Sequence, residues 1–265
     1  MSNVRYAVMV NSWILGAVLG LATTQLAVMA TTIYLHRGLA HKSLTMDKRV
    51  ALLFRIIIWI TTGIRPREWV AVHRKHHAFT DEEPDPHSPV IKGFWKIQLA
   101  NAYYYRREAS RRETVEKYAK DLLGNKLDEK LLDRSFLGLG IGIGILYLIG
   151  GWEVALIGSL VHIVSYLGIS AAVNAIGHTY GKRPYRNLAT NNNWLAFISF
   201  GEGLHNNHHA APTAARLSFT TREFDPAWTI IRILVKAKLA TVRHSKPIFS
   251  TRTGQASNLI KEASI

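Results

Sequence analysis

Histidine is the residue type whose spacing in this chain points most directly to chemistry. Eight of the twelve histidines lie in three short clusters, His36-Arg-Gly-Leu-Ala-His41, His73-Arg-Lys-His76-His77 and His205-Asn-Asn-His208-His209. The spacing i, i+3, i+4 in the last two clusters places side chains on one face of a helix, so each is expected to direct three imidazoles at one point. Because neutral imidazole is a common metal ligand, the clusters predict metal binding.

The first cluster has a different spacing. Residues five apart lie about 140° from each other on an ideal α-helix, so His36 or His41 is expected at a helix end or in an irregular turn. A ninth histidine, His178, follows an apolar segment. Two copies of the pattern His-x-x-His-His are expected by chance in fewer than about one chain in a thousand, so chance grouping does not explain them.

The number of imidazoles and the absence of cysteine narrow the type of metal site. Eight or nine imidazoles exceed the four ligands of a tetrahedral zinc ion, so two metal ions are the simplest expectation. The chain has no cysteine, which excludes thiolate-held zinc, iron–sulfur clusters and a disulfide scaffold. An all-nitrogen site suits iron, zinc, copper or nickel, and iron is the one that routinely performs oxygen chemistry with open coordination positions.

Other polar residues near the clusters have two interpretations. Asp81, Asp85, Glu202, Asn206 and Asn207 are candidates for orienting the imidazole rings through hydrogen bonds, or for capping helices and turns. Of the remaining histidines, His162 is expected to be a hydrogen-bonded core residue, while His87 and His244 are expected to be structural or solvent-exposed.

Hydropathy predicts the elements that position these clusters. The 265 residues are 48% hydrophobic with a mean hydropathy of +0.04, which lies between a soluble enzyme and a polytopic membrane protein. Residues 7–35, 132–150 and 153–176 are apolar enough to cross a bilayer, with a turn between the last two. Residues 50–64 have a shorter apolar run and are expected to form an interfacial helix. A signal peptide is the alternative for the first segment, but the apolar run of this segment is longer than the apolar region of a signal peptide.

Charge predicts the orientation of these spans. The formal net charge is +15, and lysines and arginines flank the spans at the ends nearest the histidine clusters. By the positive-inside rule these flanks are cytoplasmic and the N-terminus lies outside. Residues 65–131 and 177–250 are expected to form a cytoplasmic cap, within one domain covering 1–265. The aromatic and basic run 103–112 is expected to face lipid or a protein partner rather than nucleic acid.

Several motifs in this order resemble one family, the integral-membrane fatty acid desaturases of the stearoyl-CoA or acyl-lipid Δ9 type. They are the three histidine clusters, Asp85-Pro86-His87, the run from Asn174 to Tyr185, and Gly201-Glu-Gly-Leu before the last cluster. The resemblance implies a di-iron centre that uses dioxygen and two electrons to introduce a cis double bond into a saturated acyl chain. The iron ligands it implies are His36, His41, His73, His76, His77, His178, His205, His208 and His209, with Asn174 holding a metal-bound water.

The resemblance also implies a fold and partners. Together with the hydropathy pattern, it predicts an all-α membrane protein with three (or four) spans and an interfacial helix, capped by a cytoplasmic helical domain that holds the dimetal site. Similar desaturases have four spans, and the 35 residues before His36 are too few for two, so either a first span is absent or the chain is a short, atypical member. The expected partners are membrane lipids, a fatty acyl substrate on CoA, a carrier protein or a lipid ester, and a separate electron donor such as ferredoxin or cytochrome b5.

A substrate tunnel beside the metals is expected as well. Trp69 and Trp194 are candidates for its lining, and the basic residues Arg65, Arg67, Arg74 and Lys75 are candidates for binding the phosphates of CoA, a carrier or a lipid head group. Two other functions fit the histidine clusters. One is a fatty acyl or alkyl hydroxylase on the same scaffold, and the other is a non-catalytic membrane metal-binding protein.

Overall fold

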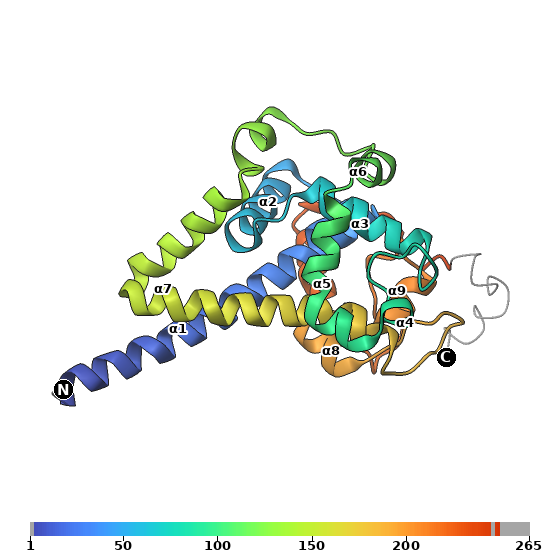
Figure 1. Ribbon diagram of the computed structural model, residues 1–265. Coiled ribbons are helices and arrows are strands. Elements are labelled where there is room, and N and C mark those ends of the chain that lie inside the picture. The colour runs from blue at the N-terminus through green and yellow to red at the C-terminus, as the bar shows by residue number, and fades with distance from the viewer. Residues whose placement is uncertain (1–2, 245–246, 250–265) are drawn as a thin grey trace.

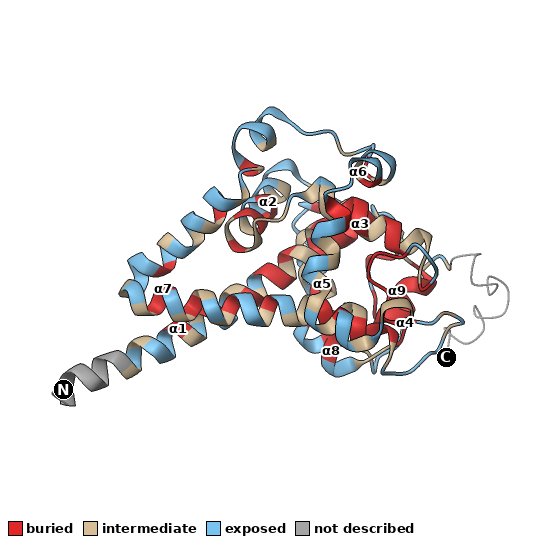
Figure 2. Cartoon of the chain, viewed as in Figure 1, coloured by how far each residue is buried: buried red, intermediate tan, exposed pale blue. Residues whose placement is uncertain are grey.

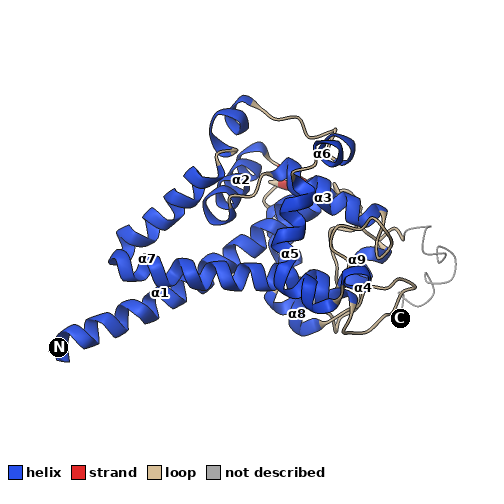
Figure 3. Cartoon of the chain, viewed as in Figure 1, coloured by secondary structure: helices blue, strands red, loops and turns tan. Residues whose placement is uncertain are grey.

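The computed structural model describes residues 3–244 and 247–249 and is almost entirely helical (Figures 1 and 3). In chain order the longer elements are α1 (Asn3–Ala30), the π-helix η1 (Thr31–Ala40), α2 (Lys48–Thr62), α3 (Pro66–Ala78), α5 (Phe94–Ala109), α7 (Ser135–Ala175) and α10 (Pro226–Lys236). The shorter ones are β1 (Leu44–Met46), α4 (Pro89–Lys92), α6 (Arg112–Tyr118), η2 (Asp128–Leu132), η3 (Ile176–His178), α8 (Asn193–Ile198), α9 (His205–Ala210) and β2 (Ala240–Val242). The predicted helical fold class is therefore confirmed.

Two helical segments are long and apolar enough to cross a membrane, Val10–Ala40 and Ser135–His178. The first consists of α1 and η1, so helical backbone continues five residues beyond the predicted span end at residue 35. The N-terminal part of α1 extends away from the other helices (Figure 2), and among its described side chains Trp13, Ile14 and Val18 are exposed. This exposure is what a lipid-facing segment requires. The number of spans remains a prediction.

The second segment is bent where a turn between two spans was predicted. Gly150 and Gly151 have non-helical backbone angles, and the φ of 80° at Gly151 is one that glycine adopts readily. The 41 residues of α7 therefore form two arms that meet at this bend (Figure 1). The first arm begins at Ser135 rather than at residue 132. The reason is that Leu132 is the last residue of the separate element η2. The backbone oxygen of Leu132 accepts a hydrogen bond from Arg55.

Close helix packing joins α7 to the N-terminal helix. At the crossing of α1 and α7, a Cβ atom added to Gly20 would lie 2.5 Å from the backbone oxygen of Gly158. No larger residue fits between the two backbones at this point. Small residues of this kind allow helices in a membrane to approach closely, since van der Waals packing is their main source of attraction.

The predicted interfacial segment forms α2, which packs against α1 and the first arm of α7. Its Arg55 is 3% exposed and forms ion pairs with Asp128 and Asp133, both at 3.0 Å. Leu52, Leu53 and Ile56 are exposed on α2. The helix therefore has one face buried against the spans and another that is apolar and uncovered, as an interfacial helix requires.

The main hydrophobic cluster lies where the first span ends. It includes Ile33 and Leu35 of η1, Phe54 and Ile58 of α2, and Ile231 of α10, all 6% exposed or less. Strands β1 and β2 pair antiparallel beside it, with Leu44 opposite Val242. This cluster fixes the end of the first span against the C-terminal part of the described chain. The predicted end of the cap, at residue 250, lies outside the described residues.

Candidate metal centre

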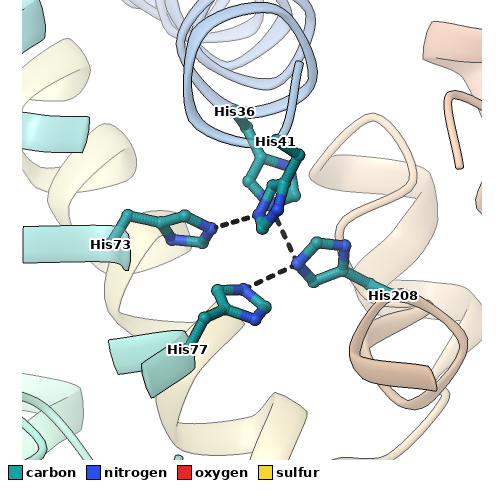
Figure 4. A group of neighbouring side chains, drawn as sticks. All are labelled: His36, His41, His73, His77 and His208. Carbon is teal, nitrogen blue, oxygen red and sulfur yellow. Dashed lines mark hydrogen bonds between the residues drawn. The ribbon is translucent and has the colours of Figure 1, made fainter. Parts of the chain in front are cut away.

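Nine histidines meet as two groups; they come from η1 and the residue that follows it, α3, η3 and α9. The five-histidine group consists of His36, His41, His73, His77 and His208, and Figure 4 shows their rings directed at a common centre. The four-histidine group consists of His76, His178, His205 and His209. Within each group, every potential ligand atom lies within 4.8 Å of every other. All nine histidines predicted as ligands are therefore brought together.

The π-helix explains how the first cluster contributes two imidazoles to one group. In η1 the backbone N–H of His41 donates to the oxygen of His36, five residues earlier, at 3.0 Å. This i to i+5 bond widens the turn, so residues five apart lie on the same side of the helix. The predicted irregular turn at His36 and His41 is confirmed.

The other two clusters divide their side chains, so the prediction that each directs three imidazoles at one point is wrong. In α3, His73 and His77 belong to the five-histidine group and His76 to the other. In α9, His205 and His209 belong to the four-histidine group and His208 to the other. The reason is geometric. Positions i and i+4 are about 40° apart around a helix, whereas i+3 and i+4 are about 100° apart and point to two sides.

Ring nitrogens face each other in both groups. In the five-histidine group, Nε2 of His41 lies 2.8 Å from Nε2 of His73, and Nε2 of His208 lies 2.9 Å from that of His77. In the four-histidine group, Nε2 of His205 lies 3.2 Å from Nε2 of His209. Burial, followed by the charge of neighbouring histidines, lowers the pKa well below the usual value for these residues: His41, His73, His77, His205, His208 and His209. Neutral imidazoles whose nitrogens converge on one point fit a metal ion between them.

Carboxylates lie beside the outer nitrogens of three rings, as predicted for Asp81, Asp85 and Glu202, and the two aspartates form hydrogen bonds with them, whereas Nδ1 of His36 forms none with Glu202. Nδ1 of His76 lies 2.8 Å from Oδ2 of Asp85, Nδ1 of His178 lies 2.7 Å from Oδ2 of Asp81, and Nδ1 of His36 lies 2.9 Å from Oε2 of Glu202. Such contacts fix the tautomer and direct Nε2 inward. Burial would raise the pKa of the two aspartates, but the hydrogen bonds and charge of their histidine partners lower it overall, so both are ionised.

The same prediction is wrong for Asn206 and Asn207. The amide of Asn206 bonds the backbone of Tyr185 and Ala189, and that of Asn207 bonds Leu217 and Glu223. Both asparagines are fully buried. Their positions between two ligands of α9 place them on the side of the helix that faces the surrounding loops, so they fix those loops around α9 instead of contacting the rings.

A buried arginine next to the first ligand was not foreseen. Arg37 is 1% exposed and binds both carboxylate oxygens of Asp225, at 2.9 and 3.0 Å. It also donates to the backbone oxygens of Ala215 and Phe200, and it lies 3.6 Å from Glu202. The sequence signal was available, because a charge that follows an apolar span directly needs a partner. Arg37 links η1 to the loops that flank α9.

Two histidines outside the two groups, His87 and His162, are also buried. For His87 the structure agrees with the structural alternative, since the residue is buried, and both its ring nitrogens lack a hydrogen-bond partner among the described residues. Its ring lies 4.8 Å from that of His76, and burial together with the charge of His76 lowers its pKa to about 3. The expectation for His162 is confirmed, since its nitrogens lie 3.1 Å from Oγ1 of Thr24 and 2.7 Å from the backbone oxygen of Thr61.

A cavity of about 590 Å³ leads from the histidines along the helices. His36, His73 and His205 line one part of it, together with Asn174 of α7. Most of the remaining lining is apolar and comes from α1, α2, α3 and α7 and from the loop between α2 and α3, including Leu26, Ile60, Ile64, Val72, Ile143, Leu146, Ile163 and Leu167. The shape and chemistry suit a long apolar molecule that reaches the metal site.

One of the two predicted tunnel tryptophans lines this cavity. Trp69 lines the cavity, and its ring stacks on that of His73 with the ring centroids 4.9 Å apart. Trp194 is 85% exposed on α8 and is not among the lining residues, because its position at the start of that helix faces outward. Stacking on Trp69 restricts the orientation of His73 and covers it on the cavity side.

A second cavity, of about 540 Å³, adjoins the first. The two share Thr62, Arg106 and Leu139 as lining residues, and the second adds Arg65 and Arg134. It thus places three guanidinium groups beside the apolar cavity. Arg67, also predicted to bind phosphate, is exposed and does not line it.

For Arg74 and Lys75 the prediction of phosphate binding is wrong, because other residues of the protein already pair with both side chains. Arg74 donates to the backbone oxygens of Leu39, Ala40 and Tyr118 and pairs with Asp121. Lys75 is buried in an ion pair with Glu108 at 2.7 Å.

Comparison with known proteins gives one consistent family. A family model described as fatty acid desaturase matches residues 11–243. The chain is 34% identical to the Acyl-CoA C20 Delta5-desaturase of Anemone leveillei over 81% of its own length and 69% of that protein. It is 34% identical to Delta-9 acyl-lipid desaturase 2 of Arabidopsis thaliana, over 80% of this chain and 69% of that one. The sn-1 stearoyl-lipid 9-desaturase of Anabaena variabilis is 32% identical, over 80% of this chain and 78% of that protein.

Proposed function

Since the chain belongs to the fatty acid desaturase family, we propose that it introduces a cis double bond into the saturated fatty acyl chain of an acyl-CoA or acyl-lipid. The reaction consumes one dioxygen, two electrons and two protons, removes two hydrogens from adjacent carbons, and releases two waters. The observation that carries the proposal is the apolar cavity that ends at histidines of both groups. An unactivated carbon chain has no polar handle, so position beside the metals must select the carbons that react.

The two histidine groups are proposed to hold one iron ion each. The ligands would be His36, His41, His73, His77 and His208 for one ion and His76, His178, His205 and His209 for the other, with Asn174 holding a water on the second. Bound iron would supply dioxygen activation and hydrogen abstraction. The observation supporting a metal is that nine imidazoles converge in two groups, six of them buried and three, His41, His73 and His77, half-buried.

The protein's own residues would position the acyl chain and exclude water. Apolar residues of α1, α2 and α7 enclose the chain, and Trp69 covers His73 on the side that the chain passes. Arg65, Arg106 and Arg134 line the adjoining cavity, where guanidinium groups suit the phosphates of CoA or of a lipid head group. The acyl chain would then lie with its apolar end between the helices and its anionic end among these arginines.

Two long apolar helices and the desaturase family indicate a membrane protein. We place the histidine groups on the cytoplasmic face, because the basic flanks of the apolar segments lie at that end. A separate electron donor, a ferredoxin or cytochrome b5, would approach from this side. The positive net charge would favour an acidic donor and an anionic membrane surface.

Expression in a host that lacks unsaturated fatty acids tests the proposal. Analysis of the host lipids should show a new monounsaturated acyl chain, and its double-bond position and chain length identify the substrate. A hydroxylated product without a double bond would instead support a hydroxylase. Purified protein that contains zinc alone and consumes no dioxygen would support a non-catalytic metal-binding protein.

A further inference from the structure

The two histidine groups differ in the carboxylates that support them. In the four-histidine group, two of the four rings, His76 and His178, donate Nδ1–H to buried aspartates. In the five-histidine group, only His36 lies beside a carboxylate among the described residues: its Nδ1 is 2.9 Å from Glu202 but forms no hydrogen bond with it. A carboxylate that accepts from the outer nitrogen makes the inner nitrogen a stronger electron donor to a metal. Half of the rings in the four-histidine group are therefore strengthened in this way, whereas no described ring of the five-histidine group has such a hydrogen bond.

Among the described residues, Asp81 and Asp85 pair with histidines and not with lysine or arginine. Asp81 is 7% exposed and accepts a hydrogen bond from Oγ of Ser88 at 2.6 Å. Asp85 is 1% exposed and accepts from the backbone N–H groups of Asp81 and His87, both at 3.0 Å. In the described part of the chain, no lysine or arginine forms an ion pair with either aspartate. Two negative charges thus act on the four-histidine group from a short, buried loop.

Glu202 is in a different electrostatic environment. One oxygen faces His36, and the other accepts a hydrogen bond from Oγ1 of Thr32 and lies 3.6 Å from Nη2 of Arg37. Arg37 is also paired with Asp225. The guanidinium group therefore offsets part of the charge that Glu202 presents to His36. Charges interact strongly in a buried site. This difference in surrounding charge is therefore expected to make the two metal positions electronically unequal.

We propose that these carboxylates make the two metal positions electronically unequal, so that the electron donor reduces the ion of the five-histidine group first. One electron converts one ferric ion to ferrous, and no bond is broken. The remaining ferric ion, with the higher charge, stays in the four-histidine group, beside Asp81 and Asp85. The proposal rests on the di-iron centre of the proposed function and adds the order in which its two ions accept electrons.

Mössbauer spectroscopy of the full chain loaded with ⁵⁷Fe in detergent tests this order. Spectra are recorded for the oxidised protein and after addition of one electron equivalent per chain. The two iron signals are assigned with isosteric variants that change charge but not shape. Asp85→Asn should shift the signal of the four-histidine group, and Glu202→Gln should shift the other.

In the unsubstituted protein, after one equivalent, most of the ferrous iron should appear at the site that Glu202→Gln alters. The double variant Asp81→Asn/Asp85→Asn should remove or reverse this preference. Equal reduction of both sites, or reduction first at the site that Asp85→Asn alters, would overturn the proposal. If Asp85→Asn does not fold, Asp81→Asn is used to assign the same signal, because Asp81 pairs with His178 of the same group at 2.7 Å.

Metal content and lipid products separate this proposal from the proposed function. A chain that holds two irons and desaturates lipids but reduces both irons equally keeps the function and loses the inference. A chain that binds no iron pair loses both, because the inference has no centre to act on. Iron content also shows whether a variant has changed electron order or has merely lost an ion.

Discussion

Replacing Gly142 by alanine is expected to destabilise the protein through one backbone contact. On the first arm of α7, a Cβ atom at this position would lie 3.2 Å from the carbonyl carbon of Ile60 and closer still to its oxygen. Because backbone atoms cannot rotate away, α2 and α7 must separate, and overpacking of this kind typically costs about 1–3 kcal/mol. Gly142 and Ile60 also line the cavity, so we expect weaker acyl binding as well.

Gly144→Ala is the matched control for Gly142→Ala. It lies on the same arm, and a Cβ there would have no atom within 4 Å, so this alanine gains about 0.5–1 kcal/mol of helix stability without a clash. Because both variants gain the same helix stability, they should differ by the overpacking cost alone, about 1–3 kcal/mol in the free energy of unfolding. Denaturant unfolding of the purified proteins in one detergent measures the difference. Equal midpoints, or a more stable Gly142→Ala, would refute the close contact between α2 and α7.

Three further predictions concern the site. His208→Ala should remove desaturation and lower iron content by about one ion per chain, whereas His244→Ala, outside both groups, should leave both unchanged; retained activity in the first would contradict its role. Asp225→Asn should reduce stability by about 3–5 kcal/mol because it leaves Arg37 buried without a full counter-charge, and an unchanged unfolding midpoint would show that the pair is dispensable. In metal-free protein, six histidines have a pKa below that of the unfolded chain, so the unfolded state binds more protons below about pH 6.5. Stability should be complete above this pH and fall by up to about 1.4 kcal/mol per pH unit for each histidine below it, and an unfolding midpoint that is constant from pH 8 to 5 would disagree.

The ligand set was predictable because it depends on local spacing and residue type. Two copies of His-x-x-His-His, His36 and His41 at five residues apart, and His178 after an apolar span name nine residues that the structure brings together. The bend of α7 was predictable for a similar reason, since adjacent glycines permit backbone angles that other residues avoid. Hydropathy likewise located both apolar segments, although not the residue at which α7 begins.

Local spacing does not show which imidazoles belong to the same group. A helix directs i+3 and i+4 to different sides, and only the placement of α3 against α9 and η1 shows that each side has its own group. The same holds for charges. Arg74 and Lys75 resemble free phosphate ligands in the sequence, but distant Asp121 and Glu108 pair with them. The sequence left His87 as either structural or solvent-exposed, and only the fold shows that it is buried beside His76.

The sequence by itself determined the residue types, their number and the helices that carry them, because these follow from composition and from spacing along one element. Only the tertiary structure decided the partition into five and four histidines, the pairing of Asp81 and Asp85 with one group, and the pairing of Arg37 with Asp225 and Glu202 beside the other. These contacts join residues up to 188 positions apart in the chain. Their geometry depends on how whole helices pack, and local propensity contains no information about that packing.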